Sequence, residues 1–217
     1  SSDVCSSDLG GKKFSLTTLE AARTFYSGEP RGTWSPENEI EGRNVLILGT
    51  GPSVAAHRLA IEQFIREHKP FVIALNTQKS LDESMIDVRA ACHPVRLLAD
   101  CDEHLTLPQP LATPLSMLPE PIREKLSAKK VLDFGLNVEP GKFAFQQQSA
   151  TLPTSLVVAY ALAIATSGKA NGILLAGFDG YGADDPRNAE MDALLDEYRS
   201  SEGAKALVCI TPTQIGR

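Results

Sequence analysis

The sequence predicts an α/β fold: a Rossmann-like, doubly wound and mostly parallel sheet in a three-layer α/β/α arrangement. Two observations lead to this prediction. Short, purely apolar runs recur along the chain, and helical segments separate them. Strands of a parallel sheet read as unbroken apolar runs because helices bury both of their faces.

Composition limits the classes of function. The 217 residues are 42% hydrophobic and 22% charged, enough for one globular domain with an extra arm. A net charge of −6 lacks the broad positive field of nucleic-acid binding, so we expect no nucleic-acid partner. No window approaches 18 strongly apolar residues, so we expect no membrane span. With no secretory signal in view, we expect a cytoplasmic protein.

The two ends read differently from the rest. Residues 1–9 contain the triplet SSD twice and resemble translated sequencing-adapter sequence, as do residues 214–217. A Ser-rich leader is the alternative for the first segment. We expect both to be non-native and the chain to be a fragment. Residues 10–43, with a short helix over Leu16–Tyr26, read as an arm or linker, which leaves 44–213 as the domain.

The first half of the domain begins with a buried strand over Asn44–Leu48. A helix is expected over Ser53–His68, where apolar residues recur on one face and Lys69-Pro70 ends the pattern. Phe71–Leu75 is a second buried strand, and 88–92 with a continuation at 95–98 is a third.

The second half begins with five prolines within 106–121, which indicate an irregular crossing loop before a strand over Val131–Phe134. An apolar helix is expected over Thr154–Ser167, closed by a glycine. Three further elements are then expected: a strand over Ile173–Ala176, a helix over Asn188–Arg199 and a strand over Ala206–Ile210.

In such sheets ligands bind beyond the carboxyl ends of the strands, so the loops there carry the candidate site. The first loop is Gly49-Thr50-Gly51-Pro52-Ser53, which follows a strand and opens a helix as a phosphate-binding turn does. It lacks the third glycine of the dinucleotide fingerprint and the ending of a Walker A loop. The alternative is a tight turn with Ser53 as helix cap.

Two further strand or helix ends carry polar side chains. Asn76 follows the second strand and can contact a base or ribose, or instead close an Asx turn. Thr154 and Ser155 open the apolar helix, where they serve either a phosphate or simple N-capping.

The fourth loop, Gly177-Phe178-Asp179-Gly180-Tyr181, is followed by Asp184, Asp185 and Arg187. Glycine, aspartate, tyrosine and arginine together suit ribose, phosphate and sugar contacts. The paired aspartates could hold Mg²⁺, although they also suit the start of a helix, which we favour.

Cysteine and histidine also cluster at Cys92-His93 and Cys101-x-x-His104. The spacing lacks a paired C-x-x-C motif, so buried thiols and ordinary histidines are favoured over zinc, and we assign no metal ligand.

The order of these motifs (GTGPS, ALN, TS before an Ala-rich helix, AGFDGY, ITPT) resembles the Rossmann-like domain of bacterial lipooligosaccharide sialyltransferases. MptE-like pterin pyrophosphokinases are related to it. The resemblance spans Asn44–Thr213 and implies a cytidine nucleotide as ligand. It implies nucleotide contacts from Gly49, Gly51, Pro52, Ser53, Asn76, Thr154, Ser155, Gly177, Asp179 and Tyr181. Thr50 and Phe178 lie within the same loops, and Arg187 is our own addition beside the phosphate.

Two features depart from that family. Thr50 stands where the family has Asn, and all four histidines precede the Gly177 loop, whereas the family's general base is a later His. The sequence therefore assigns no catalytic residue. It also resembles domains found behind HMG-CoA-lyase-like aldolase domains in surface-polysaccharide gene clusters, which implies an upstream fusion partner.

Three functions stay open. The first is a glycosyltransferase-like domain that uses a nucleotide-activated sugar in surface-polysaccharide synthesis. The second is a non-catalytic nucleotide- or sugar-binding module of an aldolase-type enzyme. The third is a pyrophosphokinase-like enzyme, the one alternative that needs ATP and Mg²⁺.

Overall fold

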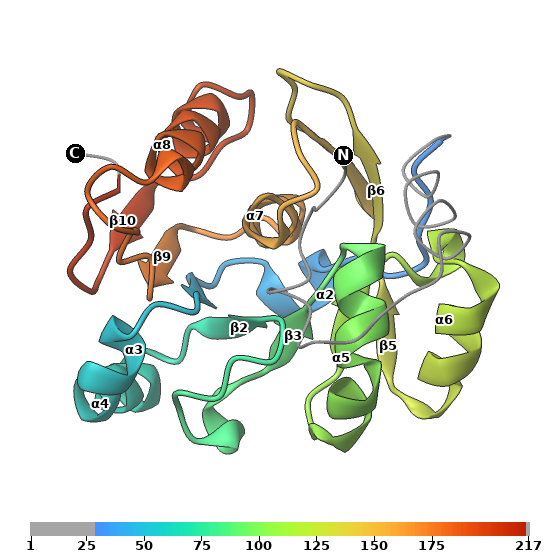
Figure 1. Ribbon diagram of the computed structural model, residues 1–217, viewed down its shortest axis with the longest axis horizontal. Helices are drawn as coiled ribbons and strands as arrows, with labels where there is room; N and C mark the ends of the chain where they lie inside the picture. The colour runs from blue at the N-terminus through green and yellow to red at the C-terminus, as the bar shows by residue number, and fades with distance from the viewer. Residues whose placement is uncertain (1–28, 216–217) are drawn as a thin grey trace.

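The computed structural model describes residues 29–215, so the predicted leader and the predicted helix over Leu16–Tyr26 lie outside the described residues. Its centre is a seven-stranded, wholly parallel sheet in the order β10-β9-β1-β2-β3-β4-β5 (Figure 1). The fold class is therefore confirmed. The strands are β1 (Val45–Leu48), β2 (Phe71–Leu75), β3 (Val88–Ala90), β4 (Leu111–Thr113), β5 (Val131–Asp133), β9 (Ile173–Ala176) and β10 (Leu207–Cys209).

The direction of winding changes beside β1. From β1 to β5 the chain adds strands on one side, and it then returns to place β9 and β10 on the other side of β1. The gap between the carboxyl ends of β1 and β9 is therefore the topological switch point, where open α/β sheets bind ligands.

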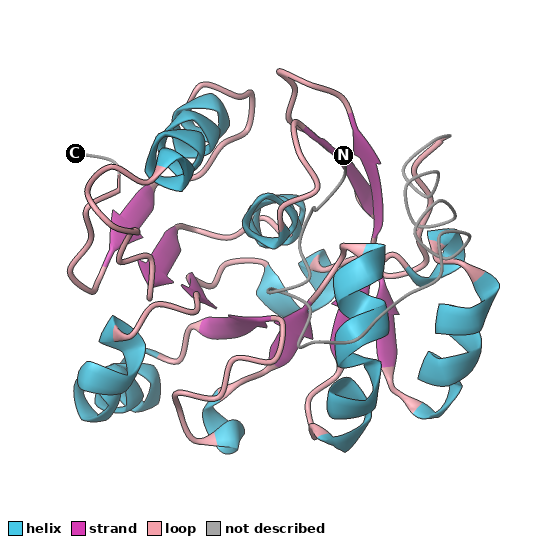
Figure 2. Cartoon of the chain, in the orientation of Figure 1, coloured by secondary structure: helices cyan, strands magenta, loops and turns pink. Residues whose placement is uncertain are grey.

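Helices cover both faces of this sheet (Figure 2). Alternate residues of β1 divide between two apolar clusters: Val45 and Ile47 share one with α7, whereas Leu46 and Leu48 share the other with α4. The α-helices are α2 (Glu37–Ile40), α3 (Ser53–Ala56), α4 (Arg58–His68), α5 (Pro94–Thr106), α6 (Glu120–Lys125), α7 (Val157–Ser167) and α8 (Pro186–Arg199). The 3-10 helices are η1 (Glu83–Met85), η2 (Leu115–Met117) and η3 (Leu126–Ala128).

A small second sheet, missed by the sequence analysis, packs on α7. It comprises β6 (Gly135–Val138), β8 (Ser149–Leu152) and β7 (Ala144–Phe145), with β6 parallel and β7 antiparallel to β8. Strands β7 and β8 of this sheet and strands β2 and β3 of the main sheet all contact α7, which explains why that helix is apolar on all sides.

Two predictions for the middle of the chain were wrong. Residues 95–98 belong to helix α5 rather than to a strand, because Pro94 occupies its first turn. The buried residues Leu97, Cys101 and His104 recur at helical spacing, which a short apolar run alone does not reveal. The predicted loop 106–121 holds strand β4, whose three residues lie between two prolines.

Two helix boundaries also differ from prediction. The helix expected over Ser53–His68 is split into α3 and α4 at His57. The helix expected from Thr154 begins at Val157, so neither Thr154 nor Ser155 caps it.

Flanking residues pack onto the domain. In the predicted arm, the backbone N–H groups of Thr33 and Trp34 both donate to Asp133 O at 2.9 Å, and Ile40 is fully buried. At the other end Ile215 is 5% exposed and joins the main apolar cluster. No helix within residues 29–215 has both the length and the apolar character that a bilayer crossing requires.

Candidate functional site

The glycine turns after β1 and β9 lie against each other at the switch point. The Gly49 N–H donates to Ala176 O at 2.7 Å, and the Gly51 N–H donates to Gly177 O at 2.8 Å. A Cβ on Gly49 would lie 2.6 Å from Gly177 O, so this approach requires glycine. Gly177 itself has φ +79, a conformation that L side chains rarely adopt.

Asp179 fastens the two turns together. Its Oδ2 accepts from the Ser53 N–H at 2.8 Å, and its Oδ1 accepts from the Ser53 hydroxyl. Thr211 Oγ1 lies 3.0 Å from Ser53 Oγ and accepts from the Gly177 N–H at 3.0 Å. The Ser53 side chain does not cap α3, so the alternative of Ser53 as a helix cap was wrong. Both the N–H and the hydroxyl of Ser53 donate to Asp179 instead.

A cleft with a volume of about 360 Å³ opens beside this junction. Eight of its lining residues were predicted from the sequence: Gly49, Thr50, Gly51, Asn76, Gly177, Phe178, Asp179 and Tyr181. The structure thus brings the ends of β1, β2 and β9 to one cavity. Pro52 and Ser53 do not line it; Ser53 is buried beneath the turn.

Asn76 ends β2 in the left-handed region, with φ +50. Its N–H donates to Ala90 O at 2.8 Å, and its side chain hydrogen-bonds to no residue within 29–215. The Asx-turn alternative therefore lacks its side-chain hydrogen bond, and the amide lines the cleft.

A buried guanidinium supports the Asn76 loop from below. Arg89 is fully buried and donates to Asn76 O at 3.3 Å and to Gln78 O at 2.6 Å. It also donates to Gln109 Oε1 at 2.8 Å and pairs with Glu83 at 2.9 Å. These contacts give the buried guanidinium hydrogen-bond partners and one opposite charge, which offset the cost of removing its charge from water.

Tyr181 lines the cleft, is 39% exposed and has Arg187 stacked on its ring. The Arg187 guanidinium carbon lies 3.9 Å from the centre of the Tyr181 ring, a cation–π contact. Arg187 also pairs with Asp185 at 2.7 Å, and hydrogen bonds from Arg187 lower the pKa of Asp185 to about 2. Asp185 accepts from the Arg187 N–H as the N-cap of α8, which confirms the helix-start alternative for that residue.

Besides Pro52 and Ser53, three further predicted residues lie outside the cleft. Thr154 lines a neighbouring cavity of about 280 Å³, and the backbone carbonyl of Ser155 accepts from Cys92 Sγ at 3.3 Å. Arg187 reaches the site through its stacking on Tyr181.

The sequence analysis missed one cation and an apolar wall. Arg96, on the first turns of α5, lines the cleft and pairs with Asp100. A helix predicted over 95–98 would begin just after the carboxyl end of β3, and it would have placed Arg96 at the carboxyl edge of the sheet. The apolar wall is formed by Leu75, Leu156, Val157, Val158, Met191 and Ile215.

Both cysteines and one histidine of the Cys92-His93 and Cys101-x-x-His104 segments are buried. His104 is 1% exposed, so the prediction of an ordinary polar histidine was wrong there. Cys92 and Cys101 are buried, at 0% and 1% exposed, which confirms the buried-thiol alternative. Burial raises the pKa of the Cys92 thiol and lowers the pKa of His104 to about 4. Among residues 29–215 no group of three or more His, Cys, Asp or Glu side chains is arranged to hold a metal ion.

Comparison with known proteins gives a fold relationship. No protein-family model matches the sequence, and no curated protein matches it. Among solved structures, the chain is similar to the MAf glycosyltransferase from Magnetospirillum magneticum AMB-1, with a TM-score of 0.58 and 13% sequence identity. The match covers 91% of this chain and 36% of that one, so this chain spans about a third of its neighbour's length. The two proteins share a Rossmann-like α/β fold.

Proposed function

We propose that the switch-point cleft binds a nucleotide-activated sugar, with a cytidine nucleotide favoured, in a glycosyltransferase-like reaction. One observation carries the proposal: two glycine turns, fastened by Asp179, frame a cleft of about 360 Å³ between the ends of β1 and β9. The fold shared with a glycosyltransferase and the order of motifs shared with lipooligosaccharide sialyltransferases agree with it. Surface-polysaccharide synthesis is the process that this resemblance favours.

The polar groups of the cleft suit the parts of such a ligand. The Asn76 amide can both donate to and accept from a base or ribose. The Arg96 guanidinium and the Tyr181 hydroxyl can donate to the phosphate. As the sugar leaves, negative charge develops on the nucleotide phosphate, and these donors stabilise it. Asp179 acts as a positioning residue that holds the turn in place.

A specific observation favours a second candidate, a non-catalytic binding module. The described part of the cleft contains no histidine, and its one carboxylate, Asp179, is hydrogen-bonded to Ser53. No described group in the cleft is therefore free to take a proton from an acceptor hydroxyl. Such a module would bind the nucleotide without turnover, and attachment to an aldolase-type domain would be one setting for it.

Calorimetric titration of the 217-residue chain with CMP, UMP, GMP and ATP, each with and without Mg²⁺, tests the proposal. We expect a metal-independent preference for CMP. Binding of ATP that requires Mg²⁺ would instead favour the pyrophosphokinase alternative, and absence of binding at millimolar nucleotide would contradict the proposal. Incubation with a CMP-activated sugar and a sugar acceptor then separates the first two candidates, because a binding module releases no CMP.

A further inference from the structure

A further cavity among the described residues lies away from the nucleotide cleft, at the opposite end of α7. It has a volume of about 610 Å³ and is framed by the β7 strand and its turn into β8, the end of α7 and the loop before β10. Val157 and Val158 at the start of α7 line the nucleotide cleft, whereas Thr166 and Ser167 at the end of α7 line this cavity. At 1.5 Å per residue, the helix separates the two sites by about 15 Å.

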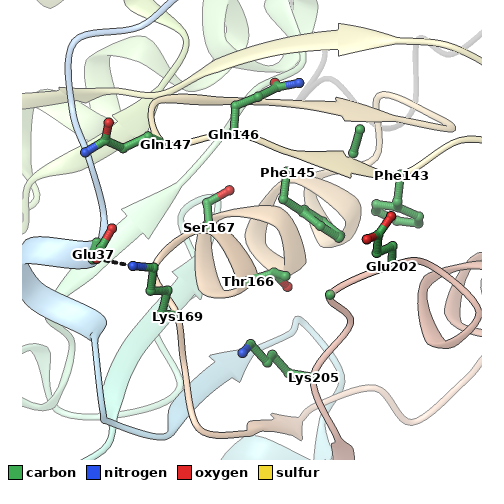
Figure 3. Close-up of a pocket in the computed structure, with 12 residues that line it drawn as sticks. Glu37, Phe143, Phe145, Gln146, Gln147, Thr166, Ser167, Lys169, Glu202 and Lys205 are labelled. Atoms are coloured by element: carbon green, nitrogen blue, oxygen red, sulfur yellow. Dashed lines mark hydrogen bonds and ion pairs between the residues drawn. The ribbon is translucent and has the colours of Figure 1, made fainter.

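One side of this cavity, which we call the α7-end pocket, is aromatic. Phe143 and Phe145 lie side by side on this wall (Figure 3), with ring centres 5.9 Å apart. Both rings also pack against Tyr198. Phe143 is nearly buried and Phe145 is half-buried, so Phe145 keeps part of its ring surface accessible. An aromatic surface held by core packing offers a rigid apolar platform to a ligand.

Polar groups without partners surround that platform. Ser167 is 9% exposed, and its hydroxyl oxygen is buried without a hydrogen-bond partner among the described residues. The side chains of Lys205, Glu202 and Gln147 also have no hydrogen bond or ion pair to another residue of 29–215. Glu202 and Gln147 are exposed to solvent and Lys205 is partly buried, so only the Ser167 hydroxyl carries the cost of an unpaired buried group. That buried hydroxyl beside a cavity points to a ligand, and the other three side chains stand ready to contact the same ligand.

The charges of the pocket define the chemistry of that ligand. Lys169 is already paired with Glu37 at 2.5 Å, and Lys205 and Glu202 contribute one charge of each sign. The positive and negative charges of the lining therefore balance, and the pocket favours neither an anion such as a phosphate nor a cation. It offers donors and acceptors for hydroxyl groups around an apolar surface.

We propose that the α7-end pocket binds a neutral oligosaccharide, with one sugar ring against Phe145. A pyranose has an apolar face of C–H groups and a rim of hydroxyls, which matches an aromatic platform rimmed by Lys205, Glu202 and Gln147. The volume lies within the range of sites that enclose small organic ligands. This site is separate from the nucleotide cleft and does not depend on the function proposed for it.

Saturation-transfer NMR of the 217-residue chain with maltotriose, cellotriose and triacetylchitotriose at millimolar concentration tests the proposal. We expect binding of at least one trisaccharide. Phe145→Leu keeps an apolar side chain but removes the ring, and Lys205→Met keeps the stem but removes the charge. Each should weaken that binding about tenfold. Lys142→Met is the matched control, because Lys142 pairs with Glu139 outside the pocket, and it should bind normally.

Two results would overturn the proposal: no binding of any of the three trisaccharides, or unchanged binding in both pocket variants. CMP titration of the same samples keeps this test independent of the nucleotide site. Phe145→Leu and Lys205→Met should bind CMP as the parent chain does, and CMP should not displace the trisaccharide. Displacement by CMP would place the saccharide in the nucleotide cleft and would contradict a separate site.

Discussion

The Asp179 carboxylate accepts a hydrogen bond from the Ser53 backbone N–H at 2.8 Å, which ties the loop after β9 to the turn after β1. The two residues are 126 positions apart in the chain. A phosphate-binding turn would offer this N–H to a ligand, whereas here the protein supplies the anion itself. We infer that Asp179 shapes the cleft and that Arg96 and Tyr181 provide the donors to a ligand.

Replacement of Asp179 by Asn should therefore loosen both turns. The amide keeps the shape of the carboxylate but loses the charge and one acceptor, so we expect a loss of about 1–3 kcal/mol in the free energy of unfolding. Urea denaturation measures this loss. Asp184→Asn is the matched control, because Asp184 is exposed in the same loop, and it should leave the stability unchanged.

The close approach at Gly51 gives a second prediction. A Cβ there would lie 2.6 Å from both Gly177 O and Asp179 Cγ, so Gly51→Ala must push the turns apart. We expect CMP affinity to fall about tenfold and stability to fall by about 1–3 kcal/mol. At Gly182 a Cβ would meet nothing within 4 Å, so Gly182→Ala should change neither quantity. Equal effects from the two substitutions would contradict the steric argument.

Tyr181→Phe separates binding from stability. The ring and its stacking on Arg187 remain, and Tyr181 is 39% exposed, so the melting temperature should not change. Loss of one hydrogen bond to the phosphate should weaken CMP binding roughly 2- to 12-fold. Calorimetry gives the affinity, and an affinity equal to that of the parent chain would remove Tyr181 from the phosphate site.

The buried Arg89 predicts a large effect on stability. Arg89→Met fills a similar volume but leaves Glu83, Gln109 and the Gln78 carbonyl without their donor. We expect a loss of about 3–5 kcal/mol. Arg123→Met on the surface of α6 is the control and should lie within about 0.5 kcal/mol of the parent chain. A small loss for Arg89→Met would show that its partners find other donors.

His104 predicts how stability depends on pH. Burial lowers its pKa from 6.5 to about 4, and its Nδ1 is buried without a partner among the described residues. Well above pH 6.5 the group is neutral in both the folded and the unfolded state and does not affect stability. As the pH falls toward 4, the unfolded chain takes up a proton first, so stability is lost, by about 3 kcal/mol in total.

NMR titration of the His104 imidazole checks this prediction directly. A midpoint near pH 4 is expected, and a midpoint at or above 6.5 would contradict it. Urea denaturation at pH 7 and pH 5 provides the second measurement, in which His104→Leu should lose this part of the pH dependence.

The sequence predicts the central strands and the switch-point loops well because β1, β2 and β9 are four- or five-residue apolar runs, each followed directly by glycine or asparagine. It fails at β4, because three residues between prolines show no periodicity. That strand exists through its pairing with β3 and β5, for example Leu111 opposite Val131. The same limit hid the second sheet, whose strands hold two to four residues.

Part of the site was hidden for a related reason. Arg96 was not predicted as a site residue because the short apolar run around it is equally typical of a strand and of a helix. Thr154 was placed in the site because the apolar pattern was extended three residues too far toward the N-terminus of α7. The partnership of Ser53 with Asp179 depends on tertiary structure, and nothing in the local sequence distinguishes it from a phosphate-binding turn.

The most direct test of the central claim is a CMP titration of the ¹⁵N-labelled chain followed by amide NMR. We predict that the largest shifts occur at Gly49, Thr50, Gly51, Asn76 and Gly177–Tyr181, without added metal. These residues would then share one nucleotide site at the switch point between β1 and β9. Shifts confined to other parts of the chain, or no shifts at millimolar CMP, would contradict the account.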